Sequence, residues 1–560
     1  MAVSTQQQRS HRYLMASVLL RCLARTALGS LAGQVIQTTG GPVQGIPAFD
    51  KAPANATLAH LDNWQDVAVW KGIPYAASTD GANRWRPPQP RASWNTTLVV
   101  DRFGDGCPTT PGQSPGTSED CLNLNIWSAA TNSTSTKLPV IFWTHPAGGS
   151  GADALFDGGG MAARGVVFVN YNHRDGAYGF LALPELTDEL KKDFAKNSNT
   201  SLPDSLASGN WAVLDQYAAL RWVHANIAAF GGDPERITVV GQSAGSAAVY
   251  HMVNAPHSLV PAGVIHGAIA ESGIRDPRDP LAASLAESYN NASYALQLGA
   301  AFLKANNATS VADLRSRPWA DLKGTSSFPG SGGGFRPTLD GYALPDTYAR
   351  LLAQPPSHAV PMITGNTRDE SGAEYGRTMT VAQYEAALTN QYGNLTSRAL
   401  AAWPAANDSE AGEAYNRQWQ DMSKVSSWGF AQGWDNATLS KNPIYTYFWD
   451  HAPPGQNQGA HHMSEINYVF NNLYKTDLPW QAQDYAIAQR MSAYWANFAR
   501  TGDPNGPGVG VNSTSLVDWR PTLVNKTVVM RVGDGWGEIP IARQEQIELI
   551  EEYFDEQVPF

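Results

Sequence analysis

Apolar runs alternate with helical stretches over residues 138–272, and this alternation predicts a mostly parallel sheet with helices between its strands. Two of the runs, Leu138–Thr144 and Val166–Tyr171, are almost continuously apolar, as strands buried on both faces are. The segment Leu214–Phe230 then carries apolar residues at helical spacing and ends at the helix-stopping sequence Gly-Gly-Asp-Pro, and the next expected strand is Ile237–Val240. The pattern therefore predicts an α/β fold.

The strand Ile237–Val240 leads directly into Gly-Gln-Ser-Ala-Gly, residues 241–245, and small and apolar residues suited to a helix follow. A serine on such a strand-to-helix turn has a strained backbone, and the flanking glycines remove side chains that would clash there. Its hydroxyl stands clear of the sheet, where the next N–H can donate to a developing oxyanion. We therefore predict Ser243 as a nucleophile and Ala244 as an oxyanion donor.

A second match to the same motif, Gly-Gln-Ser-Pro-Gly at residues 112–116, lacks this context. No apolar strand precedes it, and Pro115 has no N–H to offer an oxyanion. We interpret Ser114 as a loop residue.

The length and composition fit one large catalytic domain over residues 33–560. The 560 residues are 42% hydrophobic, and no linker, charge block or repeat divides them. The net charge of −11, without a Lys/Arg cluster, gives no basic surface for nucleic acid or anionic lipid. Small neutral or weakly polar molecules are compatible with this charge as substrates. The sequence does not indicate an oligomeric state.

The N-terminus carries a candidate leader. The first 49 residues contain no Asp or Glu, and they include a short apolar run, Tyr13–Leu20. We expect residues 1–32 to be a signal peptide that leaves Gly33 first; an Arg-rich transit peptide is the alternative, because Arg21 and Arg25 lie where a signal should be neutral. We expect no stable membrane anchor, since the run is far shorter than the ~20 residues that span a bilayer.

Acceptor sites for N-glycosylation favour the secretory route. Asn-x-Ser/Thr occurs eleven times, at Asn55, Asn95, Asn132, Asn199, Asn291, Asn307, Asn394, Asn407, Asn436, Asn512 and Asn525. One such site is often accidental, but eleven along one chain suit a secreted glycoprotein. We therefore predict an extracellular protein.

Three cysteines are present, and Cys22 would leave with the leader. The remaining pair, Cys107 and Cys121, would close a loop of about 15 residues that contributes roughly 3 kcal/mol if oxidised. Two unpaired buried thiols are the alternative. The expected oxidising compartment favours the disulfide.

Several segments together resemble the type-B carboxylesterase/lipase family of α/β-hydrolases, which includes cholinesterases and secreted fungal esterases. In chain order these are residues 70–76 (WKGIPYA), 84–88 (RWRPP), 118–125 (SEDCLNLN), 209–234 (from GNW to GGDP) and 241–245 (GQSAG). The resemblance covers nearly the whole mature chain, and the fungal secreted branch is the expected group. It implies the α/β-hydrolase fold, with a large mostly parallel sheet, helices on both faces and long loop excursions.

The resemblance also implies a Ser-Glu-His triad in that chain order. Residues 365–371 (GNTRDES) follow an expected strand, Ala359–Thr364, and the family motif places the acid at Glu370; from chemistry alone, Asp369 is an equal candidate. Residues 459–470 (GAHHMSEINYVF) are similar to the family's catalytic-histidine segment, whose register selects His462 over His461. Ser272 falls where relatives have a serine near the triad, as a supporting contact or a simple turn residue.

The expected oxyanion loop departs from the family. Most members have a Gly triplet after an aromatic residue or His, whereas here His145-Pro146-Ala147-Gly148-Gly149 follows the strand. Pro146 cannot donate, so the donors must come from the next three residues together with Ala244. By register, Ala147 and Gly148 are the predicted donors.

The implied reaction is double displacement on a small to medium, neutral carboxylic ester through a serine acyl-enzyme. We expect no cofactor and no metal, because the sequence has no Cys/His cluster and no H-E-x-x-H. Residues 107–121 hold no aromatic residue, which disfavours the quaternary-ammonium recognition of cholinesterases. An acyltransferase or lactone-forming enzyme with the same triad is the main alternative, and a non-enzymatic adhesion protein is a remote one.

Overall fold

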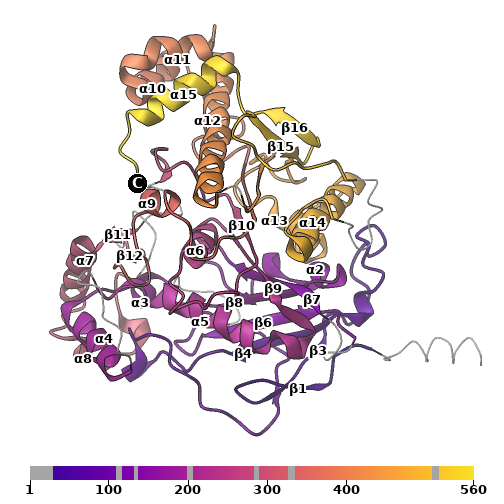
Figure 1. The fold of residues 1–560 in the computed structure, drawn as a ribbon, viewed down its shortest axis with the longest axis vertical. Coiled ribbons are helices and arrows are strands. Elements are labelled where there is room, and N and C mark those ends of the chain that lie inside the picture. Colours follow the sequence, from indigo (N-terminus) through magenta and orange to yellow (C-terminus); the bar gives the residue numbers. More distant parts are fainter. Residues whose placement is uncertain are drawn as a thin grey trace, which may run out of the picture.

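One eleven-stranded sheet organises the computed structural model, which describes residues 29–108, 116–131, 137–197, 206–282, 289–325, 334–439, 441–506 and 516–560 (Figure 1). The strand order is β16-β15-β14-β13-β10-β9-β7-β8-β6-β4-β3. The strands are β3 (Ile46–Pro47), β4 (Ala68–Pro74), β6 (Asn123–Ser128), β7 (Leu138–Thr144), β8 (Val167–Tyr171), β9 (Gly232–Gln242), β10 (Gly267–Glu271), β13 (Met362–Thr367), β14 (Ile444–Trp449), β15 (Val528–Val532) and β16 (Gly537–Pro540). All pairs from β8 to β15 are parallel, and the pairs at both ends are antiparallel.

Helices cover both faces of this sheet, which explains why its central strands are continuously apolar. In β7, Val140 and Phe142 pack into one core cluster, whereas Ile141 and Trp143 pack into another. The first cluster contains residues of α3 (Gly176–Phe180), α5 (Trp211–Asn226), α6 (Ala244–Val253), α7 (Ala292–Ala305) and α9 (Tyr348–Leu352). The second contains residues of α2 (Gly159–Ala163), α13 (Ile466–Val469) and α14 (Ala482–Thr501).

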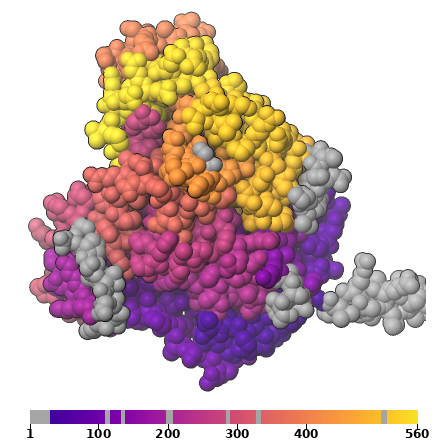
Figure 2. Space-filling view, viewed as in Figure 1, coloured from indigo at the N-terminus to yellow at the C-terminus, as the bar shows by residue number. Residues whose placement is uncertain are grey.

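A third cluster joins helices from distant parts of the chain at one end of the molecule (Figure 1). These are α10 (Val381–Tyr392), α11 (Thr396–Ala402), α12 (Asp408–Ala437) and α15 (Gln544–Asp555). Figure 2 shows this end in orange and yellow above the indigo-to-magenta body. The remaining helices are α4 (Pro184–Asn197) and α8 (Val311–Arg315), and the small sheets consist of β1 (Val35–Gln37), β2 (Pro42–Gln44), β5 (Leu98–Val99), β11 (Asn290–Asn291) and β12 (Thr338–Leu339).

The expected elements around the site are present, with shifted ends. Strand β7 has the predicted bounds, and β8 begins one residue later than predicted. Helix α5 begins at Trp211, and a short 3-10 helix extends it to Phe230, where Gly231 ends it in the left-handed conformation (φ 81°). Strand β9 then begins at Gly232, so the expected turn sequence belongs largely to the strand. The strand expected over Ala359–Thr364 is β13, which lies about three residues further on.

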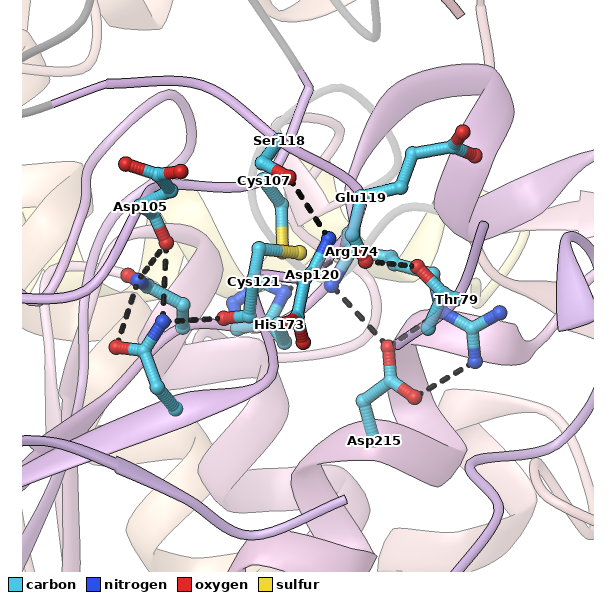
Figure 3. Close-up of a disulfide and its surroundings, with 12 residues drawn as sticks. Thr79, Asp105, Cys107, Ser118, Glu119, Asp120, Cys121, His173, Arg174 and Asp215 are labelled. Atoms are coloured by element: carbon cyan, nitrogen blue, oxygen red, sulfur yellow. Dashed lines mark hydrogen bonds and ion pairs between the residues drawn. A yellow bond between two sulfur atoms is a disulfide. The ribbon is translucent and has the colours of Figure 1, made fainter. Parts of the chain in front are cut away.

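The predicted disulfide is present. Cys107 and Cys121 are joined, with their Cα atoms 5.0 Å apart, and Figure 3 shows the bond beside Asp105 and His173. Cys22, the decoy serine Ser114 and most of the expected leader lie outside the described residues. No helix in the described ranges is long and apolar enough to cross a membrane.

Candidate active site

Ser243 lies on a sharp turn between β9 and α6. Its backbone has a positive φ (56°), and its N–H donates to the carbonyl oxygen of Glu271 at the end of the neighbouring strand β10 (2.9 Å). A Cβ on Gly241 would overlap the backbone of Gly245, and a Cβ on Gly245 would overlap the carbonyl of Thr144. The two glycines therefore let three backbone segments approach closely, which fixes the turn that presents the serine.

His462 and Glu370 form a direct pair, from the loops after β14 and β13. The Nδ1 atom of His462 lies 2.5 Å from Oε2 of Glu370, whose Oε1 accepts the N–H of Thr367 (2.8 Å). Burial lowers the pKa of His462, but the hydrogen bond and charge of Glu370 outweigh burial and raise it above its ordinary value. Burial also favours the neutral form of Glu370 and so raises its pKa, but the hydrogen bond and charge of His462 outweigh burial and lower the pKa below its ordinary value. Glu370 is therefore ionised beside the ring.

The two rival residues point elsewhere. Asp369 pairs with Arg368 (2.8 Å) and accepts the N–H of Ala460 (2.7 Å), so its carboxylate helps to hold the histidine loop. The Nδ1 atom of His461 lies 3.3 Å from the carbonyl oxygen of Gly459. The structure thus brings Glu370 to His462, as the family register predicts, and places Asp369 and His461 in supporting contacts.

Gln242, the residue directly before Ser243, contacts the ring of His462. Its Nε2 lies 3.1 Å from Nε2 of His462, and among the described residues no hydrogen bond joins that ring to the Ser243 hydroxyl. Because Nδ1–H is donated to Glu370, Nε2 is the acceptor nitrogen of the neutral ring. It accepts the hydrogen bond that the amide of Gln242 donates. Because Gln242 directly precedes Ser243, the acceptor face of His462 is turned toward the serine's turn.

The expected oxyanion loop, residues 145–151, follows β7. The N–H of Gly149 donates to Pro146 O (3.1 Å) inside a turn and is therefore not directed at an oxyanion. Gly148 has a positive φ (73°), and the Ala147 side chain is exposed. Ala244, the first residue of α6, has an N–H without a partner inside the helix.

The comparisons with known proteins match this architecture. The model of the carboxylesterase family matches residues 33–546. The chain belongs to this family. It is 34% identical to the fumonisin B1 esterase of Sphingopyxis macrogoltabida over 79% of this chain and 80% of that protein. It is 30% identical to human cocaine esterase over 79% of this chain and 81% of that protein. A solved PNB esterase superposes with a TM-score of 0.69 at 26% identity, covering 93% of this chain and all of that one.

This carboxylesterase is therefore an α/β-hydrolase that hydrolyses carboxylic esters as a serine esterase. These relatives come from a bacterium and from humans, and the fungal branch stays a prediction. Within the described ranges, no group of three or more His, Cys, Asp and Glu side chains could hold a metal ion.

Two further carboxyl groups lie fully buried behind the His462–Glu370 pair of the carboxylesterase. Burial raises the pKa of Glu271, whose Oε1 accepts the indole N–H of Trp495 (2.7 Å). Burial raises the pKa of Glu465 as well, and the charges of Glu271 and Glu370 add to it. Neither Glu465 oxygen has a hydrogen-bond partner among the described residues. Both groups therefore favour the neutral acid.

From the sequence, we assigned no role in the site to the side chains of Gln242, Glu271 and Glu465. Gln242 occupies a variable position of the Ser243 motif, yet it ends the stretch of β9 that is buried from Ile237 onward, and its polarity there was an available signal. Glu465 follows His462 by three residues, and this spacing fixes the register of the histidine, but it does not indicate a buried carboxyl group. Ser272, beside Glu271, is buried with a positive φ (50°), and its hydroxyl has no partner among the described residues.

Proposed function

We propose that Ser243, Glu370 and His462 are the catalytic triad of this esterase. The observation that carries the proposal is the His462–Glu370 pair, with Nδ1 of the ring 2.5 Å from the carboxylate and Nε2 turned toward the residue before Ser243. This arrangement selects the tautomer that can take a proton from a serine.

In the proposed reaction, the Ser243 hydroxyl attacks the ester carbonyl while His462 Nε2 takes its proton. Glu370 stabilises the resulting imidazolium through Nδ1–H. The tetrahedral intermediate collapses, and His462 returns the proton to the leaving alcohol. Water repeats the attack on the acyl-enzyme and releases the acid, which restores the enzyme.

Ala147, Gly148 and Ala244 are the proposed oxyanion donors. Gly149 is excluded because its N–H is used in the turn, and Pro146 has no N–H. Backbone donors held by a rigid loop stabilise developing charge without reorganising during the reaction.

For substrates we propose small to medium neutral esters. The net charge of −11 disfavours anionic substrates, and the aromatic-free disulfide loop disfavours quaternary ammonium groups.

We also propose that the protein is secreted, with residues 1–32 as signal peptide and 33–560 as one catalytic domain. The Cys107–Cys121 disulfide supports an oxidising compartment. All eight glycosylation-site asparagines within the described residues are exposed, as glycan attachment requires.

The test compares Ser243→Ala with Ser114→Ala, the serine of the decoy motif, on p-nitrophenyl acetate. We expect Ser243→Ala to fold and to lose at least ~10³ in kcat/KM, since triad members act as a unit. Ser114→Ala should be close to the wild type. Equal losses in both variants would contradict the assignment, and a run with added alcohol reports any acyl transfer.

A further inference from the structure

Four asparagines lie buried side by side, three of them in the neighbouring strands β6 and β8 and Asn172 directly after β8. They alternate with apolar or aromatic residues in Asn123-Leu124-Asn125 and Asn170-Tyr171-Asn172. Strands β6 and β8 pair antiparallel with Asn125 opposite Asn170, and the N–H of Asn172 donates to Asn123 O (2.9 Å). Because alternate residues of a strand share a face, the four amides meet there, and each residue is at most 6% exposed. We call this group the asparagine cradle.

The cradle holds the far end of the oxyanion loop. Gly151 N–H donates to Asn172 Oδ1 (2.7 Å), and Asn125 Nδ2 donates to Gly151 O (3.1 Å). A Cβ on Gly151 would lie 3.0 Å from both Asn125 Nδ2 and Asn170 Oδ1, closer than a side chain ordinarily packs. The hydroxyl of Ser150 also donates to Asn172 Oδ1 (3.3 Å). Glycine is thus the residue that fits this seat.

The near end of the loop is fixed by the sheet. Thr144 ends β7, its carbonyl lies against Gly245 of the serine turn, and its hydroxyl bonds the hydroxyl of Tyr171 (2.8 Å). Ala147 and Gly148 therefore lie in a short loop anchored at both ends. Where their N–H groups point depends on where the cradle holds Gly151.

Asn172 connects this loop to the backbone of Asp105 and Cys121 beside the disulfide, which we call the disulfide stem. Its Nδ2 donates to Asp105 O (3.1 Å) and to Asn123 Oδ1 (3.3 Å). Asn123 in turn donates to Asp105 O and Cys121 O, both at 3.0 Å. Figure 3 shows the Asp105 carbonyl accepting two of these bonds beside the Cys107–Cys121 bridge. The side chain of Asn172 thus uses both donors and both acceptor positions.

We propose that Asn172 is a positioning residue, which sets the place of the oxyanion donors by tying Gly151 to the disulfide stem. The proposal rests on the proposed function of Ala147 and Gly148. A displacement of about 1 Å at such donors can cost roughly 10² in rate, so a residue outside the reacting atoms can control the chemical step.

The experiment measures Asn172→Ala on p-nitrophenyl acetate and with a trifluoromethyl ketone. The serine adds to this ketone, its proton passes to His462, and an oxyanion is left in the hole, so the ketone's Ki reports the donors. We expect kcat to fall roughly 10²-fold and Ki to rise by a similar factor, with KM within about threefold. The acid limb of the pH profile should keep its midpoint, because His462 and Glu370 are untouched.

Asn210→Ala is the matched control. Asn210 is equally buried, and its amide accepts from Thr338 N (2.8 Å) and donates to Thr338 O (2.7 Å), outside the oxyanion loop. We expect it to lower thermal stability while kcat and Ki stay at wild-type values. Gly151→Ala disturbs the same seat from the loop side and should reproduce the kinetic change of Asn172→Ala, which keeps the test valid if Asn172→Ala does not fold.

Wild-type kcat and Ki in a folded Asn172→Ala or Gly151→Ala would overturn the proposal, as would an equal Ki change in Asn210→Ala. Labelling of the wild type with a fluorophosphonate distinguishes failure of the proposed catalytic function from failure of the positioning role alone. A wild type whose Ser243 is not labelled refutes the proposed function, and this inference with it. Labelled wild type with unchanged variants refutes the positioning role alone.

Discussion

His462 carries two opposing effects on its pKa. Burial favours the neutral ring, whereas the ionised Glu370 at 2.5 Å favours the imidazolium and prevails. As the proposed base, His462 must be neutral before it can take the serine proton, so we expect the contact that orients the ring also to set the lower limit of the working pH.

We predict that kcat/KM rises with pH through a midpoint above the ordinary histidine pKa of ~6.5, since the pKa of His462 is raised. His462→Ala should lose at least ~10³ in kcat, comparable with loss of the nucleophile. His461→Ala is the control and should retain most activity, because His461 bonds a backbone carbonyl. Steady-state kinetics over pH 5–9 checks both, and the reverse ranking of the two variants would contradict the register.

A second residue-scale prediction concerns Glu271. Its pKa is raised by burial, so the folded protein binds a proton that the unfolded chain releases above the ordinary Glu pKa of ~4.3. Stability due to this group is full below that value and falls as pH rises toward the raised pKa. Glu271→Gln keeps an acceptor for Trp495 and removes the titration.

We therefore expect Glu271→Gln to melt a few degrees above the wild type at pH 9 and at a similar temperature at pH 4. Thermal unfolding of both proteins across this range measures the difference. A constant offset at every pH would mean that Glu271 does not titrate in this window.

At this scale, the strand-to-helix turn that carries Ser243 was predictable because its motif and the preceding strand are local in sequence. Glu370 and His462 needed the family register, since a bare Asp-Glu or His-His pair does not say which side chain turns inward. The acidity of Glu465 was not predictable at all. Its raised pKa depends first on burial in the folded core and then on the charges of Glu271 and Glu370, which come from strands and loops about 95 to 195 residues away in the chain.

At the scale of elements, the interiors of the strands and helices expected around the site followed from their pattern, and the ends did not. Helix α5 and strand β9 meet at Gly231, so the Gly-Gly-Asp-Pro signal was correct for the helix. The strand begins within the same signal because Leu138 pairs with Gly232, a contact that depends on the fold. Tertiary pairing therefore set the boundary that local sequence could not.

The disulfide gives the prediction at this scale. Replacing Cys107 and Cys121 by Ser should lower the free energy of unfolding by roughly 3 kcal/mol, since the bridge closes a loop of about 15 residues. Urea unfolding measures the change. Dithiothreitol should destabilise the wild type and leave the double variant unchanged; equal stability of the two proteins without reductant would contradict a structural role.

At the scale of the whole molecule, the exposed acceptor asparagines predict a glycosylated, processed protein. Intact mass before and after glycan removal should show attached glycans and a start near Gly33. Leu31, on the leader side of that site, is buried against the core, so the measured N-terminus also decides whether cleavage lies further upstream. An unmodified chain that keeps Cys22 would contradict secretion.

The third core cluster has a consequence for synthesis. Helices α10, α11 and α12 pack against Ile547, Ile550 and Phe554 of α15, close to the end of the 560-residue chain. Until the ribosome has added α15, the apolar surface that α15 covers on the three earlier helices stays exposed. This surface of the nascent esterase must therefore be shielded until α15 has been made, and a chain stopped just before α15 would expose it permanently and be a target for quality control.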